Sequence, residues 1–323
     1  MSSNSFRDRV LPLAIFPALS AVAVRLLMLP LIEAKLDLDT GCRALGITGK
    51  SAIDNPLCSL VDFFTVLMHD TVGQSFLTYA MGISLPLALI PAVEAYRPGQ
   101  TKLLKYPMAW LLVSQVVSIG ITMPLYWMIS VLTNGPRKIR HGTTATYRQA
   151  DVLALAFGLV VGAVVPSVSM MVLDDPVVTA LWQIYPAYVA IAQFIHLQVR
   201  PHTQHSHSGY TALQVIYFAT LLLSSSVHMS TIWPMLKDIE SLKTLLIPTL
   251  GSLPSSANAA QFCLNFLKWD VTLAYLSTII ASFWSADSLQ QGTIMAFWYV
   301  LSIPLLGFGA SVMGVALWRN GLL

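Results

Sequence analysis

Charged residues are scarce in this chain of 323 residues: Asp, Glu, Lys and Arg make up only 10% of it. Soluble domains carry about a quarter charged residues. Hydrophobic residues account for 55%, and the mean hydropathy is +0.68. These values exclude an ordinary soluble domain and indicate a polytopic membrane protein. The net charge of +3 comes without a basic run, so nothing favours binding to nucleic acid.

Cysteine is also rare, and the known nucleotide and hydrolase motifs are missing. Cys42, Cys58 and Cys263 have no metal-ligand spacing, and their odd number argues against a disulfide framework. The chain has no Walker loop, no zinc motif and no Gly-x-Ser-x-Gly motif. We therefore expect neither a metal nor an organic cofactor.

Long apolar segments are what the chain has in abundance. A membrane-spanning helix needs about 20 mostly apolar residues. Segments of that kind cover residues 10–32, 72–94, 105–132, 151–173, 177–199, 210–236, 262–284 and 292–318. Two shorter apolar pieces, 57–68 and 243–253, are too short to cross and are expected to be re-entrant or interfacial. The predicted fold is all-α: one transmembrane helical bundle over residues 1–323, with about eight spans, or seven.

The basic residues of the connecting segments do not orient such a bundle. With eight spans, the side that holds both termini carries eight Lys and Arg residues, and the other side also carries eight. The positive-inside rule needs an excess on one side, so it decides nothing for this topology.

Polar residues recur at helical spacing inside four of the spans. Gln115, Ser118, Thr122 and Tyr126 form one such stripe, and Asp270, Ser277 and Trp284 repeat by sevens in another. Lipid would leave their hydrogen bonds unmade, so the stripes should face one another. For the Ser, Thr and Gln residues, hydrogen bonding between helices is the simpler explanation.

Three acids are the main catalytic candidates, because an ionisable side chain at membrane depth is costly. Asp270 lies inside a span and could also pair with Lys268. Glu94 ends a span, where an exposed pair with Arg97 is the alternative. Asp62 is flanked by apolar residues and either enters the bundle or faces water. His228, among serines, could be a hydrogen-bonded core residue.

Several short motifs, taken in order, resemble those of a known family. They are Leu57-Cys58-Ser59-Leu60-Val61-Asp62-Phe63-Phe64, Glu94-Ala95-Tyr96-Arg97-Pro98-Gly99-Gln100, Pro124-Leu125-Tyr126-Trp127, Trp182-Gln183-Ile184-Tyr185-Pro186 and Leu267-Lys268-Trp269-Asp270. The series is similar to fungal integral-membrane terpene cyclases of the ascofuranone and macrophorin type, which act on prenylated aromatic (meroterpenoid) substrates. The resemblance covers most of the chain.

The resemblance implies a cofactor-free, isomerase-type enzyme of fungal secondary metabolism. Its substrate would be a farnesyl-type chain on a phenolic or quinone head, often with a terminal epoxide. A neutral acid would protonate the epoxide or alkene, and aromatic faces would stabilise the migrating cation. We expect Asp270, Glu94 and Asp62 to be catalytic. The expected substrate-binding residues are Tyr126, Trp127, Trp182, Tyr185, His228, Arg97 and Trp284.

Two other functions remain open at this stage. A transporter for a small solute would usually show internal repeats or broken helices, and the sequence shows neither clearly. A non-catalytic membrane partner of biosynthetic enzymes is the other alternative. The expected partners are a lipophilic prenylated molecule and the bilayer, in the endoplasmic reticulum or another internal membrane. The sequence does not give the oligomeric state.

Turnover should not depend on a divalent metal. Soluble terpene synthases ionise diphosphates with an Asp-Asp-x-x-Asp motif, but here Asp174-Asp175 is followed by Pro176-Val177-Val178. A proton-initiated reaction has no diphosphate to neutralise. Washed membranes treated with a strong chelator should therefore keep their turnover rate. A rate that collapses and returns with magnesium would contradict this prediction.

Overall fold

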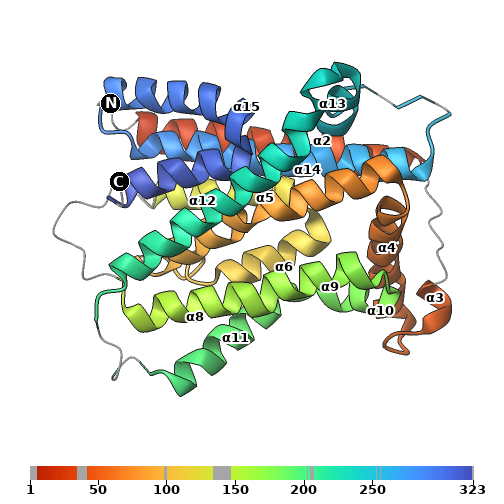
Figure 1. Ribbon diagram of the computed structural model, residues 1–323, viewed down its shortest axis with the longest axis horizontal. Helices are drawn as coiled ribbons and strands as arrows, with labels where there is room; N and C mark the ends of the chain where they lie inside the picture. Colours follow the sequence, from red (N-terminus) through yellow and green to blue (C-terminus); the bar gives the residue numbers. More distant parts are fainter. Residues whose placement is uncertain are drawn as a thin grey trace.

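The computed structural model describes residues 6–34 (main chain only from 31), 42–97, 100–133, 147–201, 203, 207–251, 253–254 and 256–321. Within these residues the fold is all-helical, as predicted, and Figure 1 shows most helices running along one direction. In chain order they are η1 (Phe6–Val10), α2 (Leu11–Ala34), α3 (Cys42–Leu45), α4 (Ser51–Met68), α5 (Thr71–Ala95), α6 (Pro107–Val117), α7 (Ile119–Leu132), α8 (Gln149–Leu159), η3 (Val160–Val164), α9 (Val165–Leu173), α10 (Pro176–Trp182), α11 (Tyr185–Val199), α12 (Tyr210–Ile232), η4 (Trp233–Lys237), α13 (Ile239–Leu246), α14 (Ala259–Ser282), η5 (Phe283–Ser285) and α15 (Leu289–Arg319).

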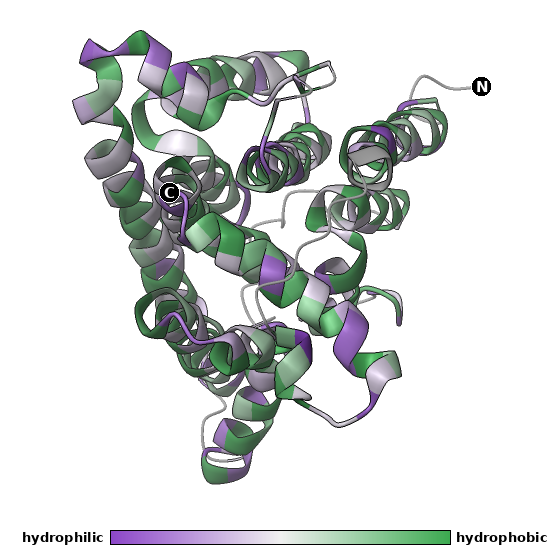
Figure 2. Ribbon diagram, turned by 90° about the vertical axis from the view of Figure 1, so that its right-hand side faces the viewer, coloured by the Kyte–Doolittle hydropathy of each residue, from purple (hydrophilic) through white to green (hydrophobic). Residues whose placement is uncertain are grey.

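The described helices have the length and the surface of membrane-embedded elements. Six are long and apolar enough to span a bilayer, or seven if the bent pair α10 and α11 forms one span. The predicted count was about eight, or seven. Large apolar side chains also cover the outside of the bundle: Val172 is 73% exposed, Phe194 64% and Val300 70%. Figure 2 shows hydrophobic residues along the outer helices.

The segment predicted as a single span over 105–132 is instead a hairpin of two short helices. Ser118 separates α6 from α7 and has φ 100° and ψ 140°, outside the helical region. Trp110 and Tyr126, each eight residues from Ser118, have ring centroids 5.8 Å apart. Ser114 and Thr122, each four residues away, are hydrogen-bonded at 2.5 Å. The arms are about 16 and 21 Å long, too short for a hydrocarbon core of about 30 Å.

The predicted span over 292–318 also folds back on itself, at Gly307 in α15. This glycine has φ 84° and ψ 168°, which ends the first arm of the helix. Across the bend, Trp298 Nε1 donates to the carbonyl oxygen of Ser311 at 2.9 Å, and the hydroxyls of Ser302 and Ser311 lie 2.8 Å apart. The two arms therefore lie side by side, and α15 begins and ends at the same end of the bundle (Figure 1).

The bundle has two distinct ends, which we name the terminal end and the disulfide end. The terminal end, at the left of Figure 1, holds both chain termini. At the opposite end a disulfide joins Cys42 to Cys58, so the expectation of no disulfide was wrong. The odd cysteine is Cys263, which is free and buried. The apolar piece 57–68 was predicted to be too short to cross, but it belongs to the longer helix α4, which is one of the six helices long and apolar enough to span a bilayer. Helix α4 stands across this end in Figure 1.

Replacing Gly307 with alanine should destabilise the protein by about 1–3 kcal/mol. A Cβ at this position would lie 2.7–2.9 Å from the His228 ring, on a backbone that L-residues rarely adopt. Gly292→Ala, in the first turn of the same helix, is the matched control, since its added Cβ meets nothing within 4 Å. Thermal unfolding in detergent measures both variants. An equal loss in both would contradict the strain argument.

Candidate functional site

Asp270, the first acid predicted to be catalytic, sits at the tip of the α6–α7 hairpin. Its Oδ1 accepts hydrogen bonds from the Gly120 amide at 2.6 Å and from the Ser118 hydroxyl. Gly120 lies so close that a Cβ there would be 3.0 Å from that oxygen. Lys268 does not pair with Asp270, because its ammonium donates to the carbonyl oxygen of Thr244. The carboxyl group thus gives a hydrogen-bond acceptor to a backbone N–H group at the start of α7, where the helix itself offers none.

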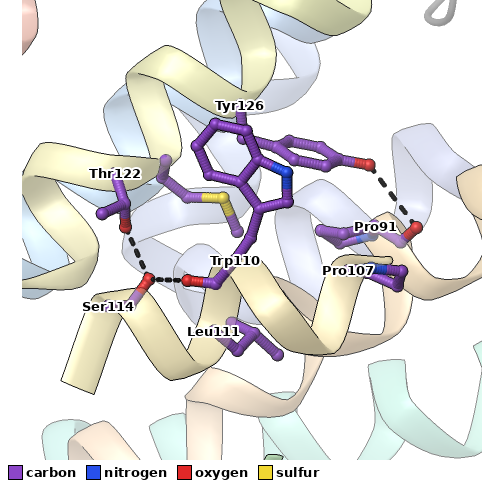
Figure 3. Close-up of a pocket in the computed structure, with 8 residues that line it drawn as sticks. Pro91, Pro107, Trp110, Leu111, Ser114, Thr122 and Tyr126 are labelled. Atoms are coloured by element: carbon purple, nitrogen blue, oxygen red, sulfur yellow. Dashed lines mark hydrogen bonds between the residues drawn. The ribbon is translucent and has the colours of Figure 1, made fainter. Parts of the chain in front are cut away.

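A chain of hydroxyl groups leads from this tip to a small cavity between α5, α6 and α7. Thr122 Oγ1 donates to the carbonyl oxygen of Ser118 at 3.0 Å and is hydrogen-bonded to Ser114. Figure 3 shows these two side chains on one wall, with Trp110 and Tyr126 on another. The Tyr126 hydroxyl donates to the carbonyl oxygen of Pro91 at 3.4 Å. The cavity is therefore polar toward Asp270 and aromatic toward the end of α5.

Glu94, the second predicted acid, is the centre of a buried ion cluster at the terminal end. Its side chain is fully buried, with Oε1 bonded to Arg319 and Oε2 lying 3.2 Å from Arg97 Nε. The pair with Arg97 exists, but it is buried and not exposed as the alternative interpretation had it. The Arg97 and Arg319 side chains are only 9% and 5% exposed. Tyr147 and Tyr217 lie within electrostatic range of both arginines.

Tyr126 and Trp127 lie between the two acids. Their rings meet edge to face at 5.3 Å, and Trp127 Nε1 donates to Thr278 at 2.9 Å. Trp127 also lines a second small cavity, whose wall includes Arg319. Seven residues of α7 separate Gly120, at the level of Asp270, from Trp127, a rise of about 10 Å. Five predicted site residues thus gather here: Asp270, Glu94, Arg97, Tyr126 and Trp127.

Three other predicted residues form a separate aromatic group at the disulfide end. Asp62 is fully buried, so its segment enters the bundle and does not face water. Next to it, Phe64 packs edge-on against Trp182 at 4.9 Å, and Trp182 stacks on Tyr185 at 5.8 Å. Phe63 touches Phe266, one turn before Asp270 on α14. The group lies on the other side of Asp270 from Glu94.

The last two predicted binding residues lie elsewhere. His228 caps the second hairpin: Nε2 lies 3.2 Å from the carbonyl oxygen of Pro304, and Nδ1 lies 2.9 Å from the Tyr79 hydroxyl. Since a carbonyl oxygen only accepts, Nε2 carries the proton and Nδ1 accepts from Tyr79. Trp284 donates to the carbonyl oxygen of Arg7 at the terminal end. Neither residue lines the two cavities.

The sequence interpretation missed Arg319, Trp110 and Tyr217. Arg319 ends the last apolar segment, where an arginine usually extends to the membrane surface. Only the fold-back of α15 brings it to Glu94. Trp110 carries no signal beyond its aromatic ring, and Tyr217 was seen only as part of a polar stripe. Within the described part of the chain, no three His, Cys, Asp or Glu side chains come together as a metal site.

Comparison with known proteins identifies the family. Residues 37–320 match the CtvD domain, a range that includes every candidate site residue. The chain belongs to the CtvD family. It is 23% identical over 300 residues to terpene cyclase ctvD of Aspergillus terreus. The matched region covers 84% of this chain and 83% of that protein. No solved structure matches this chain. The predicted resemblance to fungal terpene cyclases is confirmed.

Proposed function

We propose that this CtvD-family chain is a membrane-bound terpene cyclase that isomerises a prenylated aromatic molecule or its epoxide. The observation that carries the proposal is an aromatic-walled cavity lying between two buried carboxyl groups, Asp270 and Glu94. The name of the Aspergillus terreus relative, a terpene cyclase, supports the cyclase part of this proposal. The exposed apolar surface supports embedding in a bilayer.

The two carboxyl groups suit opposite roles in a proton-initiated cyclisation. Among the described residues, the hydrogen bonds to Asp270 both end on Oδ1, which leaves Oδ2 to carry and donate a proton. Glu94, a buried carboxyl group beyond the aromatic side chains from Asp270, would accept the proton that the cation loses at the end of the reaction. Between them, the faces of Trp110, Tyr126 and Trp127 would stabilise a carbocation by about 0.5–2 kcal/mol each.

Binding a prenyl chain would require the cavity to widen. The cavity beside Trp110 and Tyr126 measures about 10 Å³, room for roughly one water molecule. Such a tight apolar site would keep water away from the cation once the substrate has displaced these rings. Asp62, Trp182 and Tyr185 remain a second candidate group, joined to Asp270 through Phe63 and Phe266.

A solute transporter is the second candidate function, and the two hairpins favour it. Transporters often build their sites from helices that break at membrane depth, as α6–α7 and α15 do here. The family relation favours the cyclase. Membranes incubated with a farnesylated phenol or its epoxide distinguish the two, since only a cyclase yields an isomer of equal mass.

Asp270→Asn should lower kcat about a hundredfold or more, the usual contribution of a general acid. Asparagine keeps an oxygen that can accept from Gly120 and Ser118, so the folded protein should survive. Asp270→Ala removes that oxygen and should cost roughly 1–3 kcal/mol of stability as well. The exposed Asp287→Asn is the matched control. Full turnover by Asp270→Asn at equal protein level would remove Asp270 from the mechanism.

We also propose an orientation, because folding back two segments changes the count of basic residues. Eight described Lys and Arg residues now lie at the terminal end: Arg7, Arg9, Arg97, Lys102, Lys105, Arg148, Arg200 and Arg319. Five lie at the disulfide end: Arg43, Lys50, Lys237, Lys243 and Lys268, which donates to the carbonyl oxygen of Thr244. The positive-inside rule then assigns the terminal end to the cytosol. The Cys42–Cys58 disulfide independently assigns its end to an oxidising lumen, such as that of the endoplasmic reticulum.

In sealed microsomes, protease added outside should remove a tag fused to the C-terminus. A glycosylation acceptor inserted in the turn between Gly46 and Gly49 should be glycosylated, because it would lie in the lumen. The same acceptor inserted after Thr101, at the terminal end, is the control and should stay unmodified. The opposite labelling pattern would reverse the orientation.

A further inference from the structure

The ion cluster around Glu94 brings two arginine side chains to one buried carboxylate. Arg319 bonds to one carboxylate oxygen of Glu94, and Arg97 Nε lies 3.2 Å from the other. Among the described residues of the cluster, two guanidinium groups therefore share one carboxylate. Arg319 keeps an N–H group that no hydrogen bond within the described residues uses, and guanidinium groups donate strongly to oxyanions.

In the same place, two buried donors have no hydrogen-bond partner within the described part of the chain. The Tyr217 hydroxyl is unpartnered although the side chain is fully buried, and Tyr217 lies within electrostatic range of Arg97 and Arg319. Arg319 Nε is also unpartnered, in a side chain that is 5% exposed. Leaving a buried donor unsatisfied costs roughly 1–3 kcal/mol, so such groups usually serve a ligand or water.

The cluster also opens toward the proposed reaction site. Arg319 lines the second cavity together with Trp127, whose ring meets Tyr126. Asp270 lies about 10 Å further along α7. A molecule held at Arg319 by one end could therefore lie along the Tyr126 and Trp127 rings and present its other end to Asp270.

We propose that Arg319, Arg97 and Tyr217 bind an oxyanion on the head of the substrate: a carboxylate, or an ionised phenol or enol. The proposal rests on the proposed function, and it assigns the two ends of the substrate. The acidic head lies at the arginines, and the far end of the prenyl chain lies at Asp270, which protonates it. Arginine suits this task because its planar donors match two oxygens of an anion.

The test uses a farnesylated hydroxybenzoic acid carrying a terminal epoxide, and its methyl ester, with the detergent-solubilised full chain. Binding is measured directly, by the ligand-induced rise in unfolding temperature and by titration, so the result does not require turnover. The acid should bind the wild-type protein at least tenfold more tightly than the ester. Arg319→Gln should remove that preference, and the exposed Arg200→Gln should keep it.

Arg319→Gln removes one of the two partners of Glu94 and can weaken the fold, so a second variant is needed. Tyr217→Phe keeps every ion pair and removes only the unpartnered hydroxyl; it should weaken binding of the acid several-fold and leave the ester unchanged. Equal binding of acid and ester by the wild type would overturn the oxyanion site. Isomer formation is followed in parallel: its absence with selective acid binding would count against the cyclase and leave the oxyanion site standing.

Discussion

The structure depends on satisfying backbone groups where helices end inside an apolar bundle. At the tip of each hairpin, backbone N–H and C=O groups have no partner inside the helices. An apolar interior offers no water that could form hydrogen bonds with them. Asp270 accepts from the amide of Gly120 at one tip, and His228 donates to the carbonyl oxygen of Pro304 at the other. An accepting oxygen meets the amide end of a helix and a donor meets a carbonyl group, as the helix dipole favours.

This constraint gives Asp270 a structural role that is compatible with the catalytic role proposed for it. One oxygen fixes the hairpin tip, and the other is available for proton transfer. Fixing the carboxyl group also fixes where a proton would be delivered, which is the kind of preorganisation that catalysis needs. The strained backbone at Ser118, with φ 100°, is then part of the site, because the Ser118 hydroxyl itself bonds to Asp270.

The bend in α15 also brings the end of that helix to the candidate site. Without the bend at Gly307, Arg319 would lie at the opposite end of the bundle from Glu94. With it, α5 and the end of α15 meet, and a carboxylate from residue 94 binds a guanidinium from residue 319. In the most apolar stretch of helix α5, 72% of the residues are buried. The ion cluster therefore sits on a rigid element. Aromatic rings of α7 fill the space between this cluster and Asp270.

Composition and helical periodicity alone determined the class of fold, the apolar segments and the embedded acids, because these are local properties of the chain. Glu94, Tyr126 and Asp270 were identified in this way, whereas Arg97 and Trp127 were expected as binding residues from the family resemblance, and the structure brings all five together. The sequence could not show that two apolar segments fold back, since both arms of such a hairpin are as apolar as a span. Tertiary structure decided that point: the bends at Ser118 and Gly307 are held by side chains 152 and 79 residues away in the chain. The same long-range contacts gave Glu94 its partner Arg319, which hydropathy cannot reveal.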